Sequence, residues 1–263
     1  MRRRKSRRIA AFVAIGLLTG LIAGLFGVGG GAIIVPLLVI TAGFDQRLAA
    51  GTSLAAIVPL SIAGVASYAA RGDLAPLAAL ILAVGAVVGA QLGTWLLSRI
   101  PTTVLRWAFI VFLATVIVGL FVVIPSRDAH FVVTWPAGIA LAGTGLVTGV
   151  LSGLLGIGGG SIMVPVLMLG FGTSDLVAKG TSLLVIVPTS ISGTLGNMRR
   201  SNVDLPAAAA VGLAACVTTP IGAAIAALLN PFAGDVLFAL FLIISATRMA
   251  LKAARGGRAK ARA

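Results

Sequence analysis

Two glycine runs stand out as residues that could bind a ligand through backbone groups alone. They are Gly27-Val28-Gly29-Gly30-Gly31 and Gly156-Ile157-Gly158-Gly159-Gly160, and each lies within a long apolar stretch. A glycine inside a helix costs about 0.8 to 1.0 kcal/mol relative to alanine, so we expect the helix to break at each run. A new helix that starts after the break would offer free N–H groups and the positive end of its dipole, which suit an anion.

Hydroxyl residues follow both runs at the same distance, in the triplets Gly51-Thr52-Ser53 and Gly180-Thr181-Ser182. We expect them at the head of the next helix, as N-caps or as donors to a bound oxyanion. Lys179 has Ala50 as its counterpart. It is either an anion-attracting charge at a cavity mouth or an interfacial lysine that snorkels. The candidate substrate-binding residues are Gly27, Gly29, Gly30, Gly31, Thr52, Ser53, Gly156, Gly158, Gly159, Gly160, Ser161, Lys179, Thr181 and Ser182.

The two runs belong to an internal duplication. When the chain is shifted by 129 residues, residues 27–64 align with residues 156–193 without a gap, and 20 of 38 positions are identical. Duplicated halves are a recurring plan of secondary transporters, whose sites lie between the repeats. The halves are expected at residues 9–124 and 131–251, joined by a linker at 125–130 and flanked by basic tails at 1–8 and 252–263.

The composition is that of a membrane protein. Apolar residues make up 59% of the chain and charged residues only 10%, against roughly 25% in soluble domains. Crossing a hydrocarbon core of ~30 Å takes about 20 residues. We therefore expect an all-α polytopic membrane protein of two homologous four-to-five-helix repeats, with Gly-broken first helices and about eight transmembrane segments, at residues 9–26, 48–70, 74–98, 107–125, 131–155, 180–198, 205–229 and 236–247.

Two topologies remain open. With one continuous span per apolar segment, 16 of the 20 Lys and Arg residues fall on the cytoplasmic side. If each glycine run turns the chain back, residues 31–42 and 160–171 form separate short helices, each half holds five helices, and the halves are inverted. In that case 17 of the 20 Lys and Arg residues fall on the cytoplasmic side, so charge bias does not distinguish the two topologies.

Several function classes are excluded or disfavoured. The net charge of +14 comes largely from twelve basic residues near the two ends, from Arg2 to Arg8 and from Arg248 to Arg262, which indicates contact with anionic membrane lipid and not with nucleic acid. One cysteine and one histidine exclude a disulfide framework and disfavour a metal site. The dinucleotide pattern of the first run lacks a strand context, and no cofactor is expected. All six aspartates fall at expected helix ends or loops, so a mid-membrane carboxylate relay is not expected.

A second set of glycines recurs every four residues outside the runs. Small residues at this spacing let membrane helices approach closely, so we assign them to packing and not to ligand binding. They are Gly16, Gly20, Gly24, Gly85, Gly89, Gly93, Gly145, Gly149 and Gly153.

From residue 10 to 251 the sequence resembles the sulfite exporter TauE/SafE family, also described as the toluene-sulfonate uptake permease family. The resemblance rests on the doubled motif at residues 20–31 and 149–160, each copy followed at the same spacing by Pro and then Gly-Thr-Ser. It implies a permease of the bacterial inner membrane, not an enzyme, that carries small anions such as sulfite, sulfonates or sulfoacetate. A channel and a non-transporting scaffold are the alternatives, and a homo-oligomer is compatible with the sequence.

Overall fold

The computed structural model describes residues 2–122 and 135–229, with single positions between 236 and 251. The expected linker, most of the segment at 236–247 and the C-terminal basic tail lie outside the described residues. The described residues form helices and turns with no strand among them, which confirms the all-α class. The helices are α1 (Arg2–Phe26), α2 (Gly31–Thr41), α3 (Gln46–Ala69), α4 (Pro76–Arg99), α5 (Thr102–Val122), α6 (Trp135–Leu155), α7 (Gly160–Phe171), α8 (Asp175–Met198) and α9 (Leu205–Leu228).

Six of these helices, α1, α3, α4, α6, α8 and α9, are long and apolar enough to cross a membrane. The expected count of about eight spans stays a prediction, because several residues of α5 are only partly described and the last apolar segment lies largely outside the described residues. The two short helices α2 and α7 match the ranges 31–42 and 160–171 to within one residue. Both glycine runs therefore break the helix, as expected.

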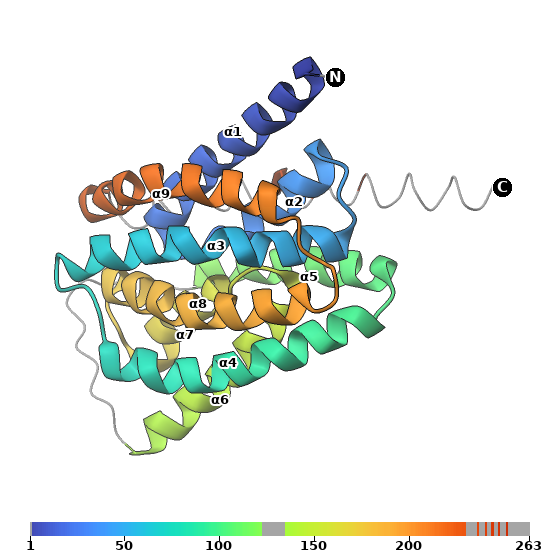
Figure 1. The fold of residues 1–263 in the computed structure, drawn as a ribbon. Helices are drawn as coiled ribbons and strands as arrows, with labels where there is room; N and C mark the ends of the chain where they lie inside the picture. Colours follow the sequence, from blue (N-terminus) through green and yellow to red (C-terminus); the bar gives the residue numbers. More distant parts are fainter. Residues whose placement is uncertain are drawn as a thin grey trace.

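The chain turns back after each break. α2 returns from the interior toward the end of the molecule where α1 begins, and α7 returns toward the opposite end, where α6 begins (Figure 1). Each half of the described chain thus contains a long helix, a glycine turn, a short helix and then further long helices. Of the two topologies left open by charge, this path matches the one with separate short helices.

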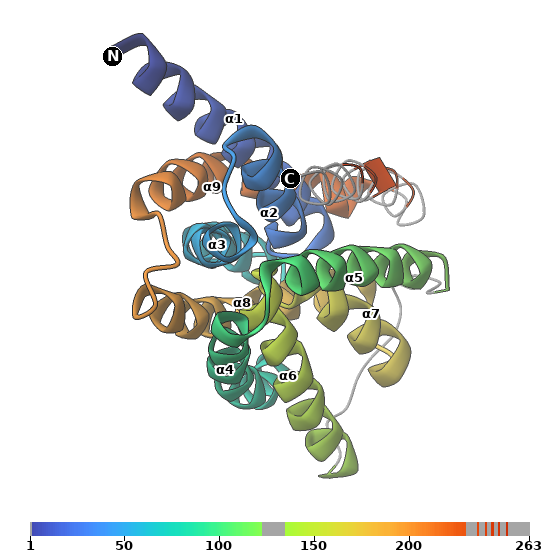
Figure 2. The ribbon, with the colours of Figure 1, turned by 90° about the vertical axis from the view of Figure 1, so that its right-hand side faces the viewer.

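Three layers of long helices are visible when the molecule is turned by 90° (Figure 2). α3 and α8 lie in the middle, between the pair α1 and α9 on one side and the pair α4 and α6 on the other. α3 and α8 are antiparallel, because Gly180 near the start of α8 packs on Tyr68 near the end of α3. At the opposite end Gly51 packs on Asn197.

The glycine stripes pack the outer pairs. A methyl group added to Gly16, Gly20 or Gly24 of α1 would overlap a backbone carbonyl of α9. The same is true of the stripes of α4 and α6, which face each other: Gly149 lies against the Ala86 carbonyl and Gly89 against the Leu146 carbonyl. Backbone approach this close is possible only without a side chain. The packing role predicted for these stripes is confirmed.

We expect Gly149→Val to destabilise the protein by about 3 kcal/mol, because valine would push the backbones of α4 and α6 apart. The matched control is Gly143→Val on the exposed face of the same helix, where an added Cβ would meet no atom within 4 Å. Unfolding by sodium dodecyl sulfate in mixed micelles measures both. Equal stability of the two variants would contradict the packing role.

Candidate functional site

The two glycine runs have the same backbone conformation. The first, third and fourth residues are left-handed in both: φ is 68°, 70° and 76° at Gly27, Gly29 and Gly30. The corresponding angles in the second run are 75°, 76° and 86°. Residues with a Cβ rarely adopt these angles, which explains why glycine occupies these positions. The fourth residue of each run, Gly30 or Gly159, is the N-cap of the short helix and makes no side-chain cap.

Each short helix begins with N–H groups that precede its first intrahelical hydrogen bond. The Gly30 carbonyl accepts from the N–H of Ile33 and Ile34, and the Gly159 carbonyl accepts from Ile162 and Met163. The N–H groups of the first two residues of α2 and α7 come before these donors. The anion-binding feature expected from the sequence, a helix start inside the protein, is therefore present twice.

The two runs lie against each other at the centre of the molecule. A methyl group on Gly160 would lie 2.8 Å from the Gly27 carbonyl oxygen, and one on Gly31 would overlap the Cα of Ile157. Ile57 of α3 and Ile186 of α8, which are equivalent in the duplication, pack on both Gly29 and Gly158. The crossing is thus filled by backbone and two isoleucines in this structure.

The serines of the Gly-Thr-Ser triplets bind the glycine run of the opposite half. Ser53 Oγ donates to the Gly156 carbonyl at 2.7 Å, and Ser182 Oγ donates to the Gly27 carbonyl at 3.0 Å. Both hydroxyls are fully buried. These two hydrogen bonds therefore join the central helices α3 and α8 to the two glycine runs.

The threonines of the same triplets hold the turns that precede α4 and α9. Thr181 Oγ1 accepts from the N–H of Ala75, and Thr52 Oγ1 accepts from the N–H of Asp204. The alternative that these hydroxyls are N-caps is wrong. Asp45 and Ser174 cap α3 and α8, so the triplets lie in the second turn of each helix, because both helices start earlier than expected.

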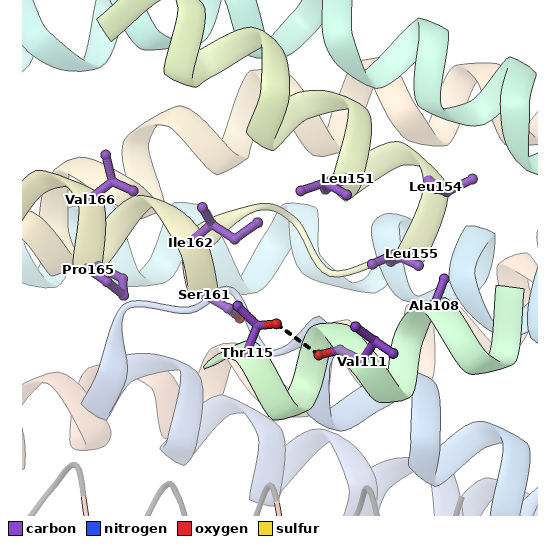
Figure 3. Close-up of a pocket in the computed structure, with 10 residues that line it drawn as sticks. All are labelled: Ala108, Val111, Thr115, Leu151, Leu154, Leu155, Ser161, Ile162, Pro165 and Val166. Atoms are coloured by element: carbon purple, nitrogen blue, oxygen red, sulfur yellow. Dashed lines mark hydrogen bonds between the residues drawn. The ribbon is translucent and has the colours of Figure 1, made fainter. Parts of the chain in front are cut away.

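Ser161, in the first turn of α7, has a different environment. It is 4% exposed, and its hydroxyl makes no hydrogen bond within the described part of the chain. It lies in the wall of a cavity of about 520 Å³ between α5, α6 and α7 (Figure 3). Ser152, before the same glycine run, is a second buried hydroxyl with no partner among the described residues. The equivalent residues of the first half are alanines, at positions 32 and 23.

The remainder of the cavity wall is almost entirely apolar. Besides Ser161, the polar lining residue is Thr115, whose Oγ1 donates to the Val111 carbonyl in its own helix at 3.0 Å. The other lining residues are Ala108, Val111, Leu151, Leu154, Leu155, Ile162, Pro165 and Val166. Among the polar side chains that line this cavity, Ser161 is therefore the one whose hydroxyl has no hydrogen-bond partner among the described residues.

Lys179 is buried and paired. Its Nζ lies 3.2 Å from Asp175 Oδ2, one turn earlier in α8, and the two side chains are 10% and 1% exposed. Neither of the two sequence interpretations included this partner, although the spacing of four residues on one helix face could have indicated it. Asp175 is also more deeply buried than its place at a helix end suggested. In the part of the chain that the structure describes, no group of three metal-ligating side chains is present.

Comparison with known proteins gives a consistent result. The profile of the family described as sulfite exporter TauE/SafE matches residues 1–120 and 141–263. The probable membrane transporter protein YunE of Bacillus subtilis is 28% identical over 237 residues, covering 81% of this chain and 86% of that protein. The probable membrane transporter protein YdhB of the same organism is 30% identical over 198 residues, which cover 73% of this chain and 80% of that protein. A probable membrane transporter protein of Haemophilus influenzae is 29% identical over 260 residues, which cover 90% of this chain and 96% of that protein. No solved structure matches the chain.

We expect Ser182→Ala and Ser53→Ala each to lower the free energy of unfolding by about 1 to 3 kcal/mol, because each leaves a buried glycine carbonyl without its donor. Ser67→Ala is the control, since Ser67 Oγ donates to a carbonyl of its own helix. Detergent unfolding of the three variants checks this. A loss no larger than that of Ser67→Ala would show that the serine bonds between the halves are not needed.

Proposed function

The chain belongs to the sulfite exporter TauE/SafE family and is a membrane transporter, and from this premise we propose that it carries small sulfur-containing anions such as sulfite, sulfonates or sulfoacetate. The family description supports this substrate class. We propose further that the anion binds at the glycine breaks, where helix starts provide N–H groups without a side-chain negative charge.

The observation that carries the proposal is the buried Ser161 hydroxyl at the start of α7. A buried hydroxyl without a hydrogen bond is costly, and this one lies beside a cavity in the first turn of α7, where the N–H groups precede the first hydrogen bond of the helix. An oxyanion seated at this helix start would accept from the hydroxyl and from the N–H groups together. It would also interact favourably with the helix dipole. The Gly and Ser residues of both breaks, with Thr52, Thr181 and Lys179, form the proposed site.

We propose that the two halves, residues 9–124 and 131–251, are inverted repeats that rock about the central crossing. The matching φ angles of the two runs and the exchanged serine bonds support this arrangement. Transporters with broken helices at equivalent positions of two repeats alternate access around such a site. The isoleucines that fill the crossing would then separate during transport.

Charge supports an orientation in the bacterial inner membrane with the N-terminus in the cytoplasm. Arg47 at the start of α3 donates to the carbonyl of Ile100, just after Arg99, so these two basic residues lie at one end. Arg199 and Arg200 end the antiparallel α8 at that same end. At the other end Arg71 and Lys179 each have an aspartate beside them. The positive-inside rule favours an orientation with the first end facing the cytoplasm.

Ser161→Ala tests the site. We expect the KM for sulfite uptake into proteoliposomes to rise about tenfold to a hundredfold, because a hydrogen bond to a charged group is worth about 1.5 to 3 kcal/mol. Folding stability should not fall, since the hydroxyl has no protein partner among the described residues.

Ser98→Ala, at a serine bonded to its own helix near the end of α4, is the control and should leave KM unchanged. An unchanged KM in Ser161→Ala would remove this serine from the site. Flux that does not saturate would favour a channel, and no flux of any oxyanion would favour a scaffold.

A further inference from the structure

The buried pair of Asp175 and Lys179 is not explained by the fold. Two charges are removed from water here, and the desolvation cost of a buried ion pair is commonly not recovered by its attraction. The Nζ–Oδ2 distance is 3.2 Å, and the side chains are 1% and 10% exposed. A pair of this kind adds little stability, so another reason for its presence has to be found.

The duplication provides an internal comparison. Gln46 and Ala50 occupy the equivalent positions of the first half. The helix that carries them, α3, has the same length as α8 and makes the same serine bond to the opposite glycine run. The backbone arrangement therefore forms equally well with a neutral amide and a methyl group. The ion pair is not a requirement of this packing.

Lys179 of the pair is in direct contact with the first glycine run, which is part of the proposed site. A methyl group on Gly27 would lie 2.6 Å from Lys179 Cβ, so the glycine run packs on the lysine backbone. Ser182, about one turn further along α8, donates to the carbonyl of the same Gly27. A change in the charge state at Asp175 would thus act on the helix face that holds the first glycine run.

We infer that Asp175 and Lys179 form a proton-binding site that couples anion transport to proton movement, an inference that rests on the proposed function. When the outer side opens, the Asp175 carboxylate takes one proton from water and no longer pairs with the lysine. The Lys179 ammonium then pairs with the incoming monovalent anion. When the anion leaves on the inner side, Asp175 releases the proton there and the pair forms again. One proton and one anion cross together.

The surroundings of the pair agree with this charge balance. Tyr68 of α3 lies near enough to interact electrostatically with Asp175, and its hydroxyl donates to the Gly24 carbonyl. In the turn after α3, Arg71 and Asp73 are 3.6 Å apart, and the Asp73 carbonyl packs on Gly180. Arg71, Asp73, Asp175 and Lys179 sum to zero charge. Protonation of Asp175 leaves one positive charge, which a single monovalent anion neutralises.

The test measures uptake of methanesulfonate into proteoliposomes together with internal pH from pyranine. A sulfonic acid is a strong acid, so this anion keeps its charge near neutral pH and any proton that moves is not released by the substrate. We expect the wild-type protein to take up about one proton per anion, and uptake to be several-fold faster when the outside is acidic. Asp175→Asn should abolish both the proton uptake and the response to the pH gradient.

Two further variants complete the test. Asp175→Gln/Lys179→Ala copies the residues of the first half into the second, so we expect it to fold, without proton uptake and with a KM raised about tenfold or more. Gln46→Asn is the matched control at the equivalent position and should keep the wild-type coupling.

An unchanged proton-to-anion ratio in Asp175→Asn would overturn the inference while leaving the proposed function standing. Loss of folded protein in both Asp175 variants would make the pair structural and would also overturn it. If the wild-type protein moves neither methanesulfonate nor sulfite, the proposed function itself fails.

Discussion

The arrangement of the helices depends on how two backbone carbonyls at membrane depth obtain their hydrogen bonds. A chain that breaks its helix inside the bilayer exposes polar backbone groups that lipid cannot satisfy, so they must be satisfied by protein. Here Gly27 and Gly156 each receive a serine hydroxyl from the opposite half. This exchange requires α3 and α8 to lie antiparallel at the centre, with the glycine-packed pairs α1 with α9 and α4 with α6 outside them.

The breaks themselves could be predicted from the sequence, because clustered glycines destabilise a helix whatever surrounds them. The structure places α2 and α7 within one residue of the expected ranges. The role of the triplet hydroxyls could not be predicted, since it depends on which carbonyl of a distant segment lies opposite. The alternative that they are caps failed because Asp45 and Ser174 cap the two helices, which start earlier than expected. The burial of Lys179 likewise depends on a distant packing partner, the first glycine run at Gly27, that no local pattern shows.

The two halves share a backbone plan and differ in chemistry at a few positions. Ser152 and Ser161 flank the second break, and the equivalent residues at the first break are alanines. Asp175 and Lys179 are equivalent to Gln46 and Ala50 of the first half. All of these differences lie at the glycine crossing or in the first two turns of the central helices. The two sides of the crossing are therefore chemically distinct, although both glycine runs have the same backbone conformation.

The exchanged serine bonds also bear on how the protein is made. The donor for Gly27 is 155 residues further along the chain, and the acceptor for Ser53 is 103 residues further along. During synthesis the first half enters the bilayer with its glycine turn and its central helix lacking these partners. They become available only when α6 and α8 have been inserted. Both hydrogen bonds between the halves can therefore be in place only after α8 has been inserted, and a truncated product lacking α8 would lack the Ser182 donor for the Gly27 carbonyl.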